Sequence, residues 1–229
     1  RTPLPFALMR GLFYFSLMQA TLFDKTSSGM WFAFAVCMRF GFYALLRPRE
    51  LYSIKRRHLK LPGPKVLGSC FVAVATILDP KNRAFMGRLQ VRMVRDVNTV
   101  LWLCWYCADL APDDRLWPFS DYCFQRCLKE GCAFFGLEHV RFTPASLRAG
   151  GATHMLESGV SLSSIKFAGS WASEKAMSCY LQEAEAAATL LSMSSSSVDK
   201  LEYALTNLQF LERPPTASSS GSHGPTKSF

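Results

Sequence analysis

The chain has 229 residues, of which 49% are apolar, and it carries a formal net charge of +9. This apolar content is enough to bury a sizeable core, so a wholly disordered chain is excluded. A basic surplus on a globular domain favours a polyanion as partner, although a charge that only serves solubility gives the same count. The first residue is Arg1 rather than Met, and we expect a piece of a longer protein.

The N-terminal part predicts two apolar helices, at residues 5–23 and 30–46, with a loop at 26–29 that ends in a helix N-cap. The second helix is apolar enough to suggest a membrane span. It is short, however, and Arg39 in its middle would cost about 2.5 kcal/mol or more in lipid. We therefore interpret it as a buried core helix and expect no membrane partner. After the break at Pro48, a short helix is predicted to run to residue 54.

The central part predicts a small β-hairpin within an otherwise helical chain. Residues 70–78 are rich in β-branched residues and read as a strand, which a turn at 79–82 connects to a partner strand at 89–94. The remaining predicted helices are 96–107, 120–135, 144–157, 161–168, 173–189 and 199–211. The Pro- and Ser-rich tail at 214–229 predicts disorder. The predicted fold class is mostly α with a small antiparallel β-hairpin or sheet.

The eight cysteines lie mostly in apolar, helix-like stretches. We expect an intracellular chain, in which such cysteines are small buried hydrophobes rather than disulfides. Cys104 and Cys107 form a CxxC pair, but a zinc site needs a second pair of Cys or His at matching spacing, and the sequence offers none. We expect neither a metal nor another cofactor.

Four motifs, in chain order, hold the parts that phosphodiester cleavage without a metal requires. The reaction needs a side-chain nucleophile, fixed cations for the phosphoryl oxygens and an acid for the leaving oxygen. Arginine suits the second task, because its planar fork matches two phosphate oxygens and stays charged. The motifs contain Arg47 and Glu50, then Lys81 on a turn, then Arg148, and finally Gly169-Ser170-Trp171 with Tyr180 nine residues after the tryptophan.

Small residues follow Arg148, from Ala149 to Ala152. They cannot cover the guanidinium group, so we interpret them as room for the close approach of a ligand backbone.

In combination these motifs resemble the catalytic domain of the tyrosine recombinase and phage integrase family, to which Cre-type recombinases belong. Leu46 to Leu51 matches its box I, LRxxEL, and Lys81 matches its lysine in a β-hairpin turn. Residues 145–153 match its box II, HxLR followed by small residues and AT, except at the histidine. Residues 169–180 match G-x-(His or Trp) followed by the tyrosine. The resemblance covers roughly residues 30–190, and the order of the four motifs makes it specific.

The resemblance implies a DNA breaking-rejoining fold. Residues 1–195 would form the catalytic domain, with the family's N-terminal arm-binding domain absent from this chain, and 196–213 a C-terminal helix. Box I's Arg47 and box II's Arg148 would grip the scissile phosphate, and Glu50 would position Arg47. The resemblance thus implies a site-specific recombinase or an integrase of a mobile element.

The chemistry that the resemblance implies runs through Tyr180, which would attack the phosphorus and form a 3′-phosphotyrosyl link. Lys81 would donate a proton to the leaving 5′ hydroxyl, and Trp171 would donate its indole N–H to a phosphate oxygen. A free 5′ hydroxyl later reverses the link. Because the link stores the energy of the broken bond, neither ATP nor a metal is needed.

Double-stranded DNA is the expected partner, and basic residues near the motifs are predicted to contact its backbone without reading sequence. These are Arg49, Lys55, Arg56, Arg57, Lys60, Arg83 and Arg88, with Arg92 and Arg95 assigned to the same surface. On DNA we expect a homo-oligomer, a synaptic tetramer, in which the helix at 199–211 packs into a neighbouring subunit through a flexible serine run. The expected location is intracellular, and nuclear in a eukaryotic host.

One position departs from the family, because Ala145 stands where box II usually has histidine. A phenol with a pKa of about 10 is mostly protonated at neutral pH, and loss of a general base costs ~10²–10⁴-fold in rate. The nearest histidines, His139 and His154, do not fall on the motif position, so we propose neither as a substitute.

Several functions therefore remain open. The chain is an active recombinase, a catalytically degenerate relative that only binds DNA, or a helical interaction or metal-stabilised module. A type IB topoisomerase shares the nucleophile and the arginines, but the box II and Gly-x-Trp patterns point away from it.

Overall fold

The computed structural model describes residues 2–22, 25–63, 71–81, 84, 87 and 89–215. Its helices are α1 (Phe6–Leu22), α2 (Lys25–Tyr43), α3 (Pro48–Ser53), the 3-10 helix η1 (Arg56–His58), α5 (Val97–Tyr106), α6 (Asp121–Phe134), α7 (Pro144–Glu157), α8 (Leu162–Gly169), α9 (Glu174–Ser178), α10 (Glu183–Leu191) and α11 (Ser195–Leu208). Its strands are β1 (Leu59–Lys60), β2 (Ala73–Ile77) and β3 (Gln90–Val94).

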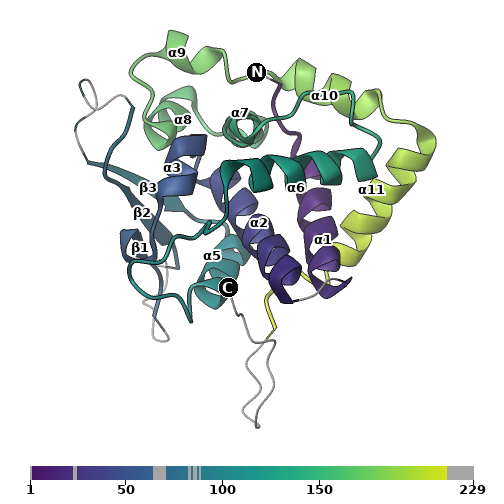
Figure 1. The fold of residues 1–229 in the computed structure, drawn as a ribbon. Coiled ribbons are helices and arrows are strands. Elements are labelled where there is room, and N and C mark those ends of the chain that lie inside the picture. Colours follow the sequence, from purple (N-terminus) through teal and green to yellow (C-terminus); the bar gives the residue numbers. More distant parts are fainter. Residues whose placement is uncertain are drawn as a thin grey trace.

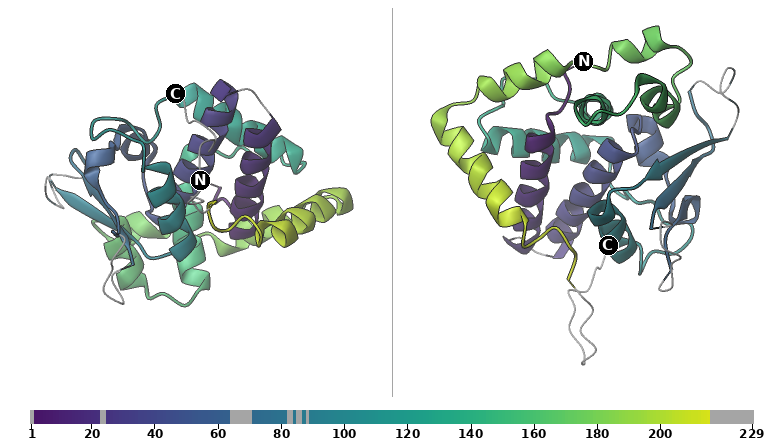
Figure 2. Two further views of the ribbon diagram at one scale, coloured as in Figure 1. Left: turned by 90° about the horizontal axis from the view of Figure 1, so that it is seen from below. Right: turned by 180° about the vertical axis from the view of Figure 1, so that it is seen from behind.

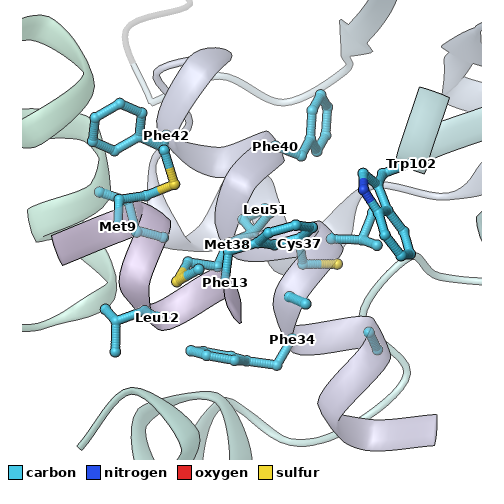
Figure 3. Packing of buried hydrophobic residues seen from close by; sticks show 14 of the residues in the cluster. Met9, Leu12, Phe13, Phe34, Cys37, Met38, Phe40, Phe42, Leu51 and Trp102 are labelled. Carbon is cyan, nitrogen blue, oxygen red and sulfur yellow. The ribbon is translucent and has the colours of Figure 1, made fainter. Parts of the chain in front are cut away.

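Helices α1 and α2 form the centre of the molecule and run side by side (Figure 1). Helix α11 lies along α1, and the sheet and α5 lie on the side of α2, as Figures 1 and 2 show. Side chains of α1 and α2 interlock in the core, where Phe13 and Phe34 are fully buried (Figure 3). Since both helices are apolar over most of their surface, burial on several sides is what stabilises them.

The three strands form one antiparallel sheet in the order β1-β2-β3. The pairing of β2 with β3 is the predicted hairpin, with Ala75 opposite Arg92. Strand β1 is an addition that the sequence did not predict, and Leu59 pairs with Ala75. The mostly helical fold with a small antiparallel sheet confirms the predicted fold class.

The predicted core role of the second helix is confirmed, and its start was placed wrongly. Helix α2 begins at Lys25, so residues 26–29 are helical rather than a loop. The Ser28 hydroxyl donates to the carbonyl of Ala20 at 2.6 Å. The hydroxyl therefore has a hydrogen-bond partner while its backbone stays helical. No helix in the described part of the chain is long and apolar enough to cross a membrane.

Arg39 of α2 is buried, and its charge is paired within the protein. It donates to Asp96 at 3.0 Å and to the Thr99 hydroxyl at 2.7 Å. Burial opposes ionisation of Asp96, but Arg39 and Thr99 outweigh it and hold the pKa of this carboxyl below its usual range. This pair fastens α5 to the middle of α2.

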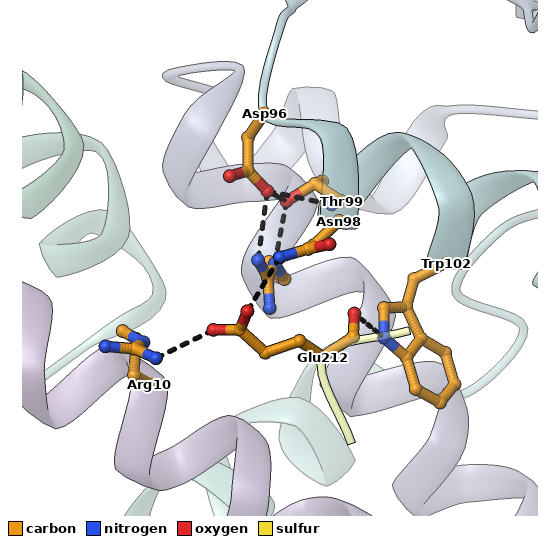
Figure 4. A network of polar contacts seen from close by, with 7 residues as sticks. Arg10, Asp96, Asn98, Thr99, Trp102 and Glu212 are labelled. Carbon is orange, nitrogen blue, oxygen red and sulfur yellow. Dashed lines mark hydrogen bonds and ion pairs between the residues drawn. The ribbon is translucent and has the colours of Figure 1, made fainter. Parts of the chain in front are cut away.

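Helix α11 packs against α1 of its own chain, where Leu201 and Leu208 are buried. Beyond it, Glu212 accepts from Arg10 at 2.7 Å and from Asn98 at 3.0 Å (Figure 4). The serine run predicted as a flexible linker is partly structured: Ser194 caps α11, and the next three serines form its first turn. The predicted disordered tail lies, from residue 216 on, outside the described residues.

The cysteines of the described chain carry no disulfide. Cys37, Cys107, Cys127 and Cys132 are buried, as small hydrophobes would be, whereas Cys179 is exposed. Burial raises the pKa of the Cys132 thiol to about 12, which makes it unreactive at neutral pH.

Candidate active site

Helix α7 places Arg148 at the centre of the candidate site. Pro144 opens the helix, at a position where its missing backbone N–H costs nothing, and Ser158 ends it. Arg148 is only 1% exposed. It donates one terminal N–H to the carbonyl of Leu45 and the other to the carbonyl of Gly169 at 2.7 Å.

Two aromatic rings cover the guanidinium group of Arg148. Its central carbon lies 4.0 Å from the ring centre of Trp171 and 5.6 Å from that of Tyr180. The two rings contact each other, with centres 5.3 Å apart. Three residues from two of the predicted motifs therefore meet through cation–π and ring contacts.

Box I contributes an ion pair at the edge of this cluster. Arg47 caps the start of α3 and donates to the buried carboxylate of Glu50 at 2.6 Å. The backbone N–H of Arg47 donates to the other Glu50 oxygen at 3.0 Å. Glu50 thus fixes both the side chain and the backbone of Arg47, the arrangement that the resemblance implied for it.

The site is strongly cationic, because its arginines outnumber the one carboxylate beside them. Arg92 of β3 also lies close to Glu50, at 3.9 Å. Arg47, Arg92 and Arg148 therefore share the single carboxylate of Glu50, which leaves two positive charges of this group uncompensated. Burial lowers the pKa of Arg148 to about 9, and the neighbouring charge of Arg47 adds to the effect. A bound anion would relieve this repulsion.

Two residues with a strained backbone lie beside Arg148. Leu45 and Ser170 are the non-glycine residues with left-handed φ in the described chain, at 51° and 49°. Leu45 supplies one carbonyl that Arg148 binds, and Ser170 follows Gly169, which supplies the other. Such conformations cost on the order of 1–2 kcal/mol each, so the surrounding contacts must hold both carbonyls in position.

The small residues after Arg148 have another purpose than the one predicted. A Cβ at Gly150 would lie 2.9 Å from the carbonyl carbon of Leu4 and closer still to its oxygen, and a Cβ at Gly151 would lie 3.0 Å from the carbonyl carbon of Phe42. These glycines let α7 approach the chain's own backbone rather than a ligand backbone. The prediction that Arg148 stays uncovered was therefore wrong, because Trp171 and Tyr180 cover it.

Tyr180 lies in a break between helices, not within one. The predicted helix at 173–189 is divided into α9 and α10. Thr153 of α7 holds the break, because its hydroxyl donates to the carbonyl of Tyr180 at 3.1 Å and accepts from the N–H of Gln182 at 3.2 Å. Tyr180 is half-buried, so its ring is neither lost in the core nor free in solvent.

Lys81 lies in the turn after β2, and its exposed side chain is not part of the packed cluster. The exposed ion pair of Arg49 with Asp79, at 3.7 Å, places this end of β2 near α3. Ala145, one turn before Arg148 on α7, is buried. His154 stacks on Phe6, with ring centres 3.8 Å apart.

The basic residues predicted to contact DNA differ in their surroundings. Arg49 is 91% exposed, and Lys60 is exposed at the end of β1. Lys55 and Arg57 share Asp113, each at 2.9 Å, and Arg56 donates to backbone carbonyls. Arg83 and Arg88 lie outside the described residues.

Arg92 was misassigned to the DNA-facing surface, since its side chain is fully buried. Alternation along 89–94 predicts that apolar Val91 and Met93 face inward, yet both are about half exposed, at 52% and 47%. Gln90, Arg92 and Val94 face inward instead. Apart from Gln90, the partners of Arg92 are Ser170 and Glu50, which lie 40 or more positions away in the sequence, so local sequence carried little signal for its burial.

Comparisons with known proteins identify solved structures that share this fold. No family model matches the chain, and no curated protein matches it. Among solved structures, the XerH site-specific recombinase bound to difH substrate, a pre-cleavage complex, is similar at a TM-score of 0.55 and 14% identity, over 83% of this chain and 53% of that chain. A post-cleavage XerH complex with palindromic difH substrate matches at the same TM-score and identity, over 54% of its chain. The chain therefore spans about half the length of these recombinase chains and shares their fold.

Proposed function

We propose that this chain is a site-specific recombinase or integrase that cleaves and rejoins DNA through Tyr180. One observation carries the proposal: the guanidinium group of one predicted motif packs against the indole and the phenol of another, with Arg148 4.0 Å from the Trp171 ring and 5.6 Å from the Tyr180 ring. The fold shared with XerH recombinase complexes supports the same class of reaction.

The proposed first step is attack of the Tyr180 phenolic oxygen on the scissile phosphorus. The bond from phosphorus to the 5′ oxygen breaks, and the leaving oxygen takes a proton from Lys81, while the phenol proton passes to solvent. The product is a 3′-phosphotyrosyl link and a free 5′ hydroxyl. Attack by a 5′ hydroxyl on the link reverses these steps and restores both the DNA strand and Tyr180.

Arg47 and Arg148 are proposed to stabilise the charge that develops on the phosphoryl oxygens. The uncompensated positive charge around Glu50 supports this role, because a phosphate would neutralise it. Tyr180 covers Arg148 in the present arrangement. We propose that the phosphate enters between them as the Tyr180 segment shifts outward, and most residues of that segment are exposed.

Double-stranded DNA is the proposed partner, and its backbone is proposed to run along the basic residues near α3 and β1. Arg49 and Lys60 are the best placed for this, because both side chains are exposed. We also propose a homo-oligomer on DNA. In that assembly α11 would have to leave α1 of its own chain before it could pack on a neighbour.

A catalytically silent DNA-binding relative is the second candidate, and a specific observation favours it. Ala145 supplies no proton acceptor one turn from Arg148, and both terminal nitrogens of Arg148 are already bound to backbone carbonyls. Such a protein would bind DNA in a salt-dependent way and form no covalent product.

Covalent trapping separates the two candidates. A library of nicked duplexes with randomised sequence is incubated with the protein, and DNA that stays attached to protein under denaturing conditions is recovered and sequenced. The proposal expects an adduct with the wild type and with Tyr122→Phe, a variant of an exposed tyrosine on α6. It expects none with Tyr180→Phe. An adduct that persists in Tyr180→Phe, or DNA binding without any wild-type adduct, overturns the proposed enzyme.

A further inference from the structure

Arg92 on β3 is a buried charge that neither the motifs nor the proposed chemistry uses. Its side chain has no solvent exposure. It donates one terminal N–H to the Ser170 hydroxyl and the other to the Gln90 side-chain carbonyl at 3.2 Å, and the same nitrogen lies 3.9 Å from the Glu50 carboxylate.

The surroundings of Arg92 do not suit a residue that serves stability alone. Its Nε is buried without a hydrogen-bond partner in the described structure. The carboxylate nearest to it is already bonded to Arg47 at 2.6 Å, and Arg47 adds repulsion. A buried charge with incomplete pairing is a poor contributor to stability, because desolvation outweighs the attraction it gains.

What Arg92 does provide is a connection between the two halves of the site. On one side it reaches Glu50, which holds Arg47. On the other side it holds Ser170, whose strained left-handed backbone ends α8. The neighbouring Gly169 carbonyl is held by Arg148. Two arginines from different elements therefore fix two consecutive residues of one turn.

That turn sets the position of Trp171, the next residue along the chain. Its backbone N–H donates to the carbonyl of Lys166 at 3.0 Å, and its ring folds back over Gly169, where an added Cβ would meet the indole carbons. Because the indole contacts both Arg148 and Tyr180, a displacement of Ser170 moves the surface against which the phenol packs.

We infer that Arg92 is a positioning residue. It acts through Ser170 to hold Trp171, and thereby Tyr180, in place against Arg148. Its effect on strand cleavage rests on the proposed function, whereas its effect on the position of Trp171 does not. It touches no substrate, since it is fully enclosed.

The structural part is tested by fluorine NMR of protein labelled with 5-fluorotryptophan, in which the Trp171 resonance is identified by its loss in Trp171→Phe. Arg92→Gln and Ser170→Ala are both expected to shift or broaden this resonance. Arg95→Gln, which removes an exposed arginine directly after the same strand, is expected to leave it unchanged. Ser170→Ala removes one buried hydroxyl and keeps the apolar core, so it decides the matter even if Arg92→Gln does not fold. An unmoved Trp171 resonance in folded Ser170→Ala overturns the inference.

The functional part is tested by single-turnover trapping at saturating DNA. Arg92→Gln and Ser170→Ala are each expected to lower the rate of adduct formation about 10- to 100-fold with DNA affinity unchanged, since small misplacements of reacting groups have effects of this size. The double variant is expected to be no slower than the slower single variant, because both changes break one connection. Additive losses, or a loss of DNA affinity at an unchanged rate, overturn the positioning role. If the wild type forms no adduct, the proposed function fails, and the Trp171 resonance alone decides the inference.

Discussion

The approach of α7 to the N-terminal segment makes Gly150→Ala a sharp test of the packing beneath Arg148. In an unobstructed helix this change stabilises by about 1 kcal/mol. Here the new Cβ would lie 2.9 Å from both the carbonyl carbon and the amide nitrogen of Leu4, and closer to its oxygen. Backbone atoms cannot rotate away, so the segment must move and stretch the 3.1 Å bond from the Leu4 N–H to the Ser146 carbonyl.

The magnitude follows from three contributions. Overpacking costs about 1–3 kcal/mol, the weakened backbone hydrogen bond about 1 kcal/mol, and the gain in helix propensity offsets about 1 kcal/mol. We expect Gly150→Ala to lower the free energy of unfolding by about 1–3 kcal/mol, which for a chain of this size lowers the Tm by about 2–12 °C.

Gly29→Ala provides the matched control. Gly29 is also helical, in α2, and an added Cβ there meets nothing within 4 Å. Urea and thermal unfolding followed by circular dichroism should therefore show opposite signs, with Gly29→Ala stabilised by up to about 1 kcal/mol. A Gly150→Ala protein at least as stable as the wild type would refute the packing argument.

Three further predictions concern the charges of the site and the core. Ala145→His should raise the single-turnover rate at which Tyr180 forms an adduct by about 10²–10⁴-fold, and an unchanged rate contradicts the view that the missing base limits the reaction. Sulfate at ~100 times its Kd should raise the free energy of unfolding by about 2.7 kcal/mol relative to chloride at equal ionic strength; an equal gain in Arg148→Met would show that the anion binds elsewhere. Asp96→Asn should cost about 3–5 kcal/mol at about pH 7, because Arg39 is left unpaired. Since the pKa of Asp96 is lowered by folding, its contribution is complete above the ordinary carboxyl pKa of about 4 and is lost as the pH falls through the lower folded value, so urea unfolding at about pH 2.5 should show a smaller penalty.

Helix boundaries with a local cause were predictable from the sequence. Pro144 and Asp96 begin helices because of their own backbone geometry and capping groups, and the structure places both helices as expected. The β2–β3 hairpin was also readable, since β-branched residues flank a turn.

Features that depend on distant partners were not predictable. The break at Tyr180 lies among good helix formers and is held by Thr153, 27 positions earlier. Arg92 of β3 faces inward because Ser170 and Glu50 are its partners there. Local hydrophobicity would instead place the apolar Val91 and Met93 on the inner face. For the site, the motifs included Arg148, Trp171 and Tyr180, which meet in the structure, and also Lys81, which lies apart from them. Neither the burial of Arg148 nor its aromatic cover could be read from spacing.

The break that holds Tyr180 divides the site into an enclosed half and an exposed half. Arg148 and Glu50 are enclosed by the core, whereas between Ala172 and Tyr180 only Met177 is buried. Few apolar contacts and many solvent-exposed amides are what give a segment a low free energy of local opening. The amides of α9 should therefore exchange with deuterium long before those of α7, and such local opening would let the phenol detach from Arg148 without unfolding the domain.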